Sequence, residues 1–136
     1  DNQLCFALVT AARNVVAIYR PILEPLGLTH PQYLVMLALW EQAPRALGAL
    51  AEELAMEPAT LSPLVKRLEA QGLVTRARSS ADERVLALGL TAAGAALRAR
   101  ALEVPGQVMA ATGMSAAQVA DVRDGLAPFA GRREPY

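Results

Sequence analysis

Cys5 is the only cysteine among the 136 residues, and its thiol is the first candidate for chemistry. A lone cysteine cannot form a disulfide within the chain, so it is either a small core hydrophobe or a thiol kept for its reactivity. It lies near the first turn of an expected helix, where unpaired N–H groups and the macrodipole favour the thiolate that attacks peroxides. Because no second cysteine exists, a small-molecule thiol or overoxidation must complete such a reaction.

A second group of candidate residues lies between positions 60 and 84, where basic side chains outnumber acidic ones. The whole chain is neutral, with 13 basic and 13 acidic residues, which alone argues weakly against a nucleic-acid partner. The charges are not evenly spread, so a local basic stripe survives in a neutral protein. Its basic residues are Lys66, Arg67, Arg76, Arg78 and Arg84, and the acidic residues among them are Glu69, Asp82 and Glu83.

The composition favours one domain of packed helices. Hydrophobic residues make up 54% of the chain and aromatic residues only 4%, so Leu, Ala and Val must build the core. No uninterrupted apolar run reaches the roughly 18 residues that span a bilayer, and no signal segment is found, so we expect a soluble, cytoplasmic protein. We also expect a short N-terminal piece to be missing, because the chain begins with Asp1. No metal and no cofactor are expected.

Apolar spacing predicts a helix over about residues 2–20, and the stretch PILEPLGL predicts a break after it. Thr29 and Gln32 then have the spacing of a capping box, with Pro31 in the first turn. The helix that follows is apolar nearly all round, so we expect it at the centre of the domain, with Tyr33 and Trp40 in the core.

A helix is predicted near 47–55, and another from Pro58 that ends at Gly72. The period then changes to two, which predicts strands at 73–78 and 85–90 around the polar tip SSADER. Thr91 caps a further helix through residue 101, Pro105 and Gly106 interrupt, and Ser115 caps a last helix to about residue 126.

Two short helices followed directly by a charged hairpin make a winged helix-turn-helix, so the fold class is mainly α with a small β-hairpin wing. The second helix of such a motif enters the major groove, and Arg84, with Asp82 beside it, fits insertion of the wing tip into the minor groove. An amphipathic helix alone is more often a solvated surface, but the wing favours DNA binding. The predicted DNA-binding residues are Thr60, Ser62, Lys66, Arg67, Arg76, Arg78, Asp82 and Arg84.

The segments NQLCFAL, YRPILEPLGLTHPQYLVMLALWE, ATLSPLVKRLEAQGLVTR and DERVLALGLT resemble the MarR-type transcriptional regulators, within them the branch that senses organic hydroperoxides (OhrR-like). The resemblance implies a homodimeric repressor on a pseudo-palindromic operator, with recognition helices about 34–36 Å apart. It implies a single MarR-type domain over 1–136, in which about 1–28 and 92–136 form dimerisation helices and about 29–91 form the DNA-binding lobe. An organic hydroperoxide and a low-molecular-weight thiol are the implied reactants at Cys5.

The resemblance also implies a redox-sensing group of Cys5, Tyr19 and His30. Tyr19 matches a tyrosine whose hydroxyl lies near the reactive sulfur in that branch. Val9 and His30 stand where two further tyrosines are usual, and an imidazole can replace a hydroxyl in part. The run EPAT also departs from the branch, since Pro58 removes a hydroxyl and a backbone donor.

Three other functions are alternatives to this one. A MarR-type repressor could be released by a small aromatic or anionic ligand, with Cys5 incidental. A thiol peroxidase is disfavoured because the chain lacks a strand-rich framework and a basic partner for the thiol, so we expect no enzyme. A dimerisation module without DNA binding is disfavoured by the wing.

Overall fold

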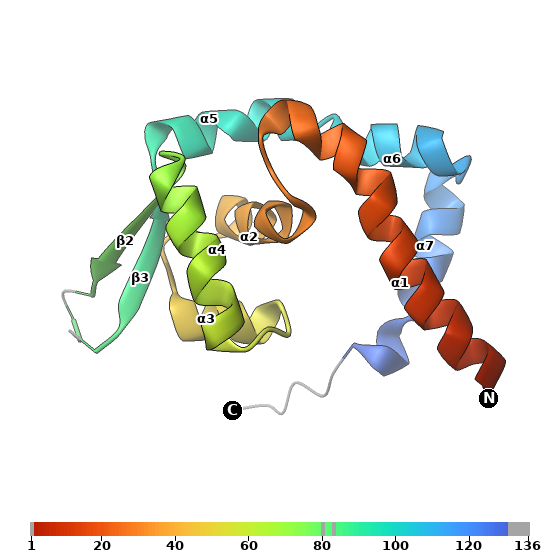
Figure 1. Cartoon of the computed structure of the whole chain (residues 1–136), viewed down its shortest axis with the longest axis horizontal. Coiled ribbons are helices and arrows are strands. Elements are labelled where there is room, and N and C mark those ends of the chain that lie inside the picture. Colours follow the sequence, from red (N-terminus) through yellow and green to blue (C-terminus); the bar gives the residue numbers. More distant parts are fainter. Residues whose placement is uncertain (1, 80, 83, 131–136) are drawn as a thin grey trace.

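The computed structural model describes residues 2–79, 81–82 and 84–130. These residues form a mainly helical fold with one small sheet (Figure 1). In chain order the elements are α1 (Asn2–Leu23), η1 (Glu24–Leu26), α2 (His30–Glu41), β1 (Arg45–Ala46), α3 (Leu47–Glu53), α4 (Pro58–Ala70), β2 (Val74–Arg78), β3 (Leu86–Leu90), α5 (Ala92–Ala101), α6 (Val104–Thr112), α7 (Ala116–Gly125) and η2 (Ala127–Phe129).

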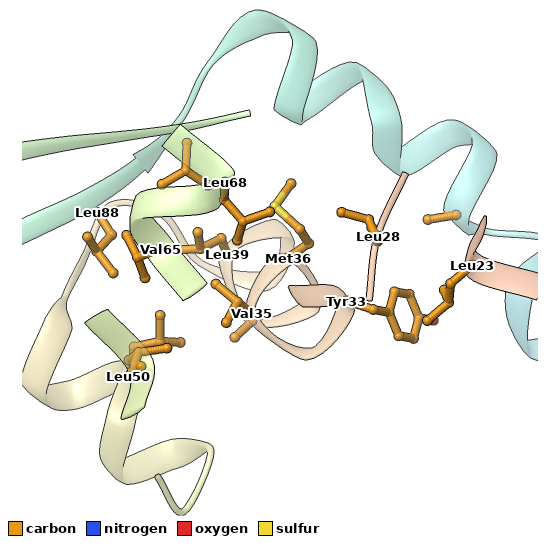
Figure 2. Close-up of a cluster of buried hydrophobic side chains, with 14 of the residues drawn as sticks. Leu23, Leu28, Tyr33, Val35, Met36, Leu39, Leu50, Val65, Leu68 and Leu88 are labelled. Carbon is orange, nitrogen blue, oxygen red and sulfur yellow. The ribbon is translucent and has the colours of Figure 1, made fainter. Parts of the chain in front are cut away.

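Helix α2 lies at the centre of the core, as its sequence predicts (Figure 2). Thr29 caps it through the predicted capping box: the Gln32 backbone N–H donates to Thr29 Oγ1, and the Thr29 N–H donates to Gln32 Oε1. Tyr33 is buried as expected, and the Trp40 ring packs against the core with its Nε1 donating to the Gly94 carbonyl at 2.9 Å. The fully buried side chains from other elements include Leu23, Leu50, Leu61, Val65, Leu68 and Leu88.

The predicted hairpin forms, with β2 and β3 paired antiparallel so that Val74 lies opposite Leu90 and Arg78 opposite Leu86. A third strand, β1, pairs with the other edge of β3 and gives the order β1-β3-β2. The sequence did not predict β1, because two residues carry no periodicity. Pairing of Arg45 with Leu88 ties the segment before α3 to the wing.

Helix α4 begins at Pro58 and ends before Gly72, as predicted, and Gly72 takes a left-handed φ of 78°. Leu61, Val65 and Leu68 are fully buried, whereas Leu64 is half-buried. The amphipathic pattern therefore fixes which face of α4 meets solvent. Figure 1 shows α3 and α4 as neighbouring helices, with the β2–β3 wing beside them.

The expected break within PILEPLGL forms, although α1 extends further into that stretch than expected, whereas the expected interruption at Pro105 does not form. α1 continues through Pro21 to Leu23, and the chain turns only after η1, at Gly27 with φ 71°. One missing hydrogen bond at Pro21 is therefore tolerated inside a long helix. Pro105 does not interrupt a helix either, because it lies in the first turn of α6, where no N–H is required. The break before α6 falls at residues 102–103 instead.

The helices at the two chain ends leave large apolar side chains exposed. Phe6 is 73% exposed, Leu102 63% and Phe129 56%. The segment Asn2–Leu26 has a mean hydropathy of 1.3, so by length and composition alone it is able to cross a membrane. Only 6% of its apolar window is buried inside the chain. No uninterrupted apolar run reaches this length, as expected, but averaged hydropathy finds the segment because the isolated charges of Arg13 and Arg20 do not offset the apolar residues around them.

Candidate functional site

The exposed face of α4 carries the predicted base and phosphate contacts. Thr60, Lys66 and Arg67 are exposed and Ser62 is half-buried. Among residues 2–79, 81–82 and 84–130, no hydrogen bond or ion pair holds the side chains of these four residues. Two hydroxyls and two cations on one helix face are therefore available to a ligand. Such a face suits the major groove, where side chains meet base edges and phosphates.

The wing tip holds Arg84 outward on Asp82. Asp82 Oδ1 accepts from the Arg84 backbone N–H at 3.0 Å and from its Nε at 3.2 Å. These hydrogen bonds lower the pKa of the Asp82 carboxyl, and they orient a side chain that is 91% exposed. Ser79 and Val85 close the hairpin above the tip, where the Ser79 N–H donates to the Val85 carbonyl at 2.8 Å. Two residues of the tip, Ser80 and Glu83, lie outside the described residues.

The two strand arginines differ in their surroundings. Arg78 is exposed beside a hollow of about 460 Å³ that Arg84 also lines. Arg76 instead forms an ion pair with Glu69 of α4 at 3.0 Å, and its Nε is buried without a partner in the described structure. Glu69 thus joins the recognition helix to the wing. Sequence reasoning placed Glu69 only among the acidic residues of the stripe, since helix-to-strand packing decides the pairing.

The predicted redox residues do not meet within one chain. Cys5 is exposed on the first turns of α1. Tyr19 lies near the other end of the same helix, and a separation of 14 residues corresponds to about 21 Å along the axis. Tyr19 and His30 do come together, with ring centroids 5.0 Å apart and edge-on, and Tyr33 lies 5.8 Å from Tyr19.

The aromatic cluster borders a hollow of about 430 Å³ between the end of α1 and the start of α2. Arg20, Glu24, Leu28 and His30 line it, so it offers a cation, a carboxylate, an apolar wall and an imidazole. Burial raises the pKa of the Tyr19 hydroxyl. Burial and the neighbouring Tyr19 raise the pKa of Tyr33, and both phenols are therefore neutral hydrogen-bond donors at neutral pH.

His30, the only histidine, should make stability fall with acidification. Burial lowers the pKa of His30, so the unfolded chain, with an ordinary value of about 6.5, binds a proton more readily than the folded chain. The stabilisation is complete above about pH 6.5 and is lost as the pH falls toward the lowered folded value. Urea unfolding at a series of pH values should show this decrease and a flatter profile for His30→Gln. Parallel profiles for the two proteins would contradict it.

Comparisons with known proteins define the class of this chain. A family model described as "Transcriptional regulator SarA/Rot" matches residues 17–99. The chain is 38% identical over 126 residues to the organic hydroperoxide resistance transcriptional regulator of Bacillus subtilis (strain 168), and the match covers 93% of this chain and 86% of that protein.

Solved structures agree with this match. Overoxidised AbfR bound to DNA is 33% identical with a TM-score of 0.76, over 92% of this chain and 88% of that one. A MarR-family regulator from Rhodococcus sp. RHA1 is 27% identical with a TM-score of 0.80, over 95% and 93% of the two chains.

The chain belongs to the MarR/SarA-type winged-helix transcriptional regulators, which are DNA-binding proteins rather than enzymes. Within that family it is an OhrR-like regulator. The family resemblance and the mainly helical winged fold predicted from the sequence are thereby confirmed.

Proposed function

We propose that this chain is a homodimeric repressor that senses organic hydroperoxides by oxidation of Cys5 and then releases its operator. The observation that carries the proposal is the exposed lone thiol on α1 of a winged-helix regulator. The fold connects that helix to a DNA-binding lobe. The similarity to a hydroperoxide resistance regulator supports the choice of oxidant.

Exposed apolar side chains at both chain ends support the homodimer. Residues 1–28 and 92–136 form the dimerisation part and residues 29–91 the DNA-binding lobe, all within one domain. Burial of a side chain such as Phe6 or Phe129 by a second copy contributes about 1.5–3 kcal/mol, which favours association over exposure to water. A membrane would also cover α1, but we propose a cytoplasmic protein because its proposed partner is DNA. Size measurement in solution separates the two cases, since a dimer forms without detergent.

The dimer has a chemical role in this proposal, because only two chains together bring Cys5 close to Tyr19. The two residues cannot touch within a chain, because about 21 Å of helix separates them. An antiparallel arrangement of two α1 helices places Cys5 beside Tyr19 and His30 of the partner subunit. Each dimer then has two sensing sites, and each site is made of both chains.

The chemistry at each site is a two-electron oxidation. The Cys5 thiolate attacks the terminal oxygen of the hydroperoxide, an S–O bond forms, the O–O bond breaks, and the alcohol leaves after it gains a proton. A low-molecular-weight thiol then attacks the sulfenic acid, and a mixed disulfide and water form. The hydroperoxide is reduced and the cysteine is oxidised. The added group enlarges a side chain at the dimer contact.

The proposed DNA contacts follow from the described geometry. Thr60 and Ser62 reach base edges, and Lys66, Arg67 and Arg78 reach phosphates. Arg84, held by Asp82, enters the minor groove. Arg76 contributes through its pair with Glu69, which fixes the wing against α4. The dimer presents its two recognition helices about 34–36 Å apart on a pseudo-palindromic operator.

A gel shift on the DNA upstream of the protein's own gene, with and without cumene hydroperoxide, tests this function. Release from DNA together with a mass increase at Cys5 supports it. Retention of DNA by fully oxidised protein would refute it.

A second function has one observation in its favour. The hollow of about 430 Å³ has the size for a small aromatic ligand, and Arg20, which lines it together with Glu24 and His30, offers a partner for an anionic group. In that case Cys5 is incidental, and a salicylate-like ligand rather than a hydroperoxide releases DNA. Titration of the DNA complex with each compound separates the two functions.

Tyr19→Phe should slow the oxidation of Cys5 without unfolding the protein. The change removes only a hydroxyl whose neutral form donates a hydrogen bond to a thiolate at the shared site. Loss of a hydrogen bond to a charged group corresponds to about a ten- to hundredfold slower reaction. Stopped-flow loss of the free thiol measures the rate, with Tyr33→Phe as the matched control. Equal rates for parent and Tyr19→Phe would show that Tyr19 only packs.

A further inference from the structure

Gln32 is the buried polar residue of the described core, with 5% of its surface exposed. Its side-chain oxygen accepts from the Thr29 backbone N–H at 3.0 Å. Its side-chain nitrogen donates to Gln71 Oε1, also at 3.0 Å. Because a buried amide is costly unless it is hydrogen-bonded, these contacts fix the position of Gln32.

Gln71 carries the link onward from the end of the recognition helix. It is the C-cap residue of α4, and its Nε2 donates to the Gly27 carbonyl at 2.8 Å. The amide of Gln71 therefore accepts from Gln32 with its oxygen and donates to Gly27 with its nitrogen. Both groups that the pair reaches, the Gly27 carbonyl and the Thr29 N–H, belong to residues 27–29. That short segment joins η1 to α2, and it is called the joint below.

The joint is also where the aromatic cluster lies. Gly27, Thr29 and His30 line the same hollow of about 430 Å³, and the His30 ring contacts Tyr19 of α1. A displacement of His30 or of the end of α1 therefore moves backbone atoms that the two glutamines hold. Either the hydrogen bond from Gln71 to Gly27 breaks, or the C-terminal end of α4 follows the joint.

From this arrangement we infer that Gln32 and Gln71 couple the joint to the recognition helix. Gln71 is a positioning residue: it lies at the end of α4, beyond the exposed face that carries Lys66 and Arg67, and acts through the helix. The inference rests on the proposed function for the event that moves the joint, oxidation of Cys5 beside Tyr19 and His30 of the partner subunit. It adds the contacts through which oxidation changes the position of the recognition helix and so the binding of DNA.

Three variants separate the two halves of the link. Gln71→Met keeps the length of the side chain and removes both hydrogen bonds. Gln71→Glu keeps an acceptor for Gln32 and loses the donor to Gly27. Gln32→Met places an apolar side chain of similar size in the core, so the protein should remain folded, which circular dichroism checks.

Gln118→Met is the matched control. It is the same substitution and removes the same kind of capping hydrogen bond, from the Ser115 N–H to Gln118 Oε1 on α7, outside the proposed DNA-binding lobe and away from the joint.

Hydrogen exchange of residues 27–33, with and without operator DNA, is the first measurement. In the parent and in Gln118→Met, DNA should slow exchange there by about threefold or more, although the joint is not part of α4 or the wing. All three link variants should lose this protection. The second measurement is the ratio of operator Kd values for oxidised and reduced protein. The ratio should fall by about three- to tenfold in the link variants, and equally in a Gln32→Met/Gln71→Met double variant.

Two outcomes would overturn the inference. One is that DNA does not slow exchange at the joint in the parent, or that it slows exchange equally in the parent and in the link variants. The other is a shift of both Kd values together with an unchanged ratio, which a merely structural role produces. If the parent itself shows equal Kd values after oxidation, the proposed function fails instead. The exchange measurement, which needs no oxidant, then decides the coupling by itself.

Discussion

Cys5→Ser is expected to bind operator DNA as the parent does and to keep holding it when organic hydroperoxide is added. Serine keeps the size of the side chain and loses its redox chemistry. DNA affinity should be unchanged, because the start of α1 lies at the opposite side of the molecule from the β2–β3 wing (Figure 1). In the parent, oxidation should weaken binding by about 5- to 150-fold, the usual range for coupled sites.

Fluorescence anisotropy on labelled operator, before and after a fixed dose of cumene hydroperoxide, measures both affinities. Intact mass of the same samples is the control, since the chain also contains four methionines that peroxide can oxidise. Release of DNA by the serine variant after peroxide treatment would contradict the proposal that Cys5 is the sensor. Release by the serine variant together with a gain in its mass would assign the release to methionine oxidation.

Arg84→Ala should weaken DNA binding on all sequences. The Arg84 side chain is 91% exposed and its guanidinium is paired with Asp82. It supplies one cationic contact per subunit and two per proposed dimer. If each neutralises about one phosphate, the slope of log K against log salt becomes shallower by roughly two. The difference in affinity between parent and variant should then shrink by about tenfold between roughly 50 and 200 mM salt.

Arg123→Ala provides the control for Arg84→Ala, because its side chain on α7 is 75% exposed and lies outside the proposed DNA-binding lobe. It should leave both affinity and salt slope as in the parent. Dimerisation and Cys5 oxidation should be unchanged in both variants. Parent-like binding by Arg84→Ala would show that the wing tip stays out of the groove.

Local sequence patterns were sufficient to predict the elements whose hydrogen bonds join residues close together in the sequence. The capping box of Thr29 and Gln32 joins residues three apart, and the glycine stop of α4 depends on one backbone angle. Proline was a poorer guide, because its cost depends on where it lies in a helix. Pro21 lies inside α1 and Pro105 at the start of α6, and neither ends a helix.

Contacts between distant residues could not be predicted in the same way. The bridge from Gln32 to Gln71 joins residues 39 positions apart, and no periodicity indicates it. The exposure of Lys66 and Arg67 follows from the amphipathic pattern of α4, but the pairing of Arg76 with Glu69 depends on how the wing packs. In the proposed dimer, Cys5 meets Tyr19 only across two chains. The sequence of one chain therefore predicts which residues form the site but not that they are in contact.

The long separation of Cys5 and Tyr19 on α1 has a genetic consequence. If every sensing site takes its thiol from one subunit and its phenol from the other, defects at the two positions do not affect both sites of a mixed dimer. A dimer of one Cys5→Ser chain and one Tyr19→Phe chain has one site with both defects and one site with neither. Expression of both alleles together therefore yields mixed dimers with one intact sensing site, which neither variant forms alone. Complementation between alleles thus follows from the length of a single helix.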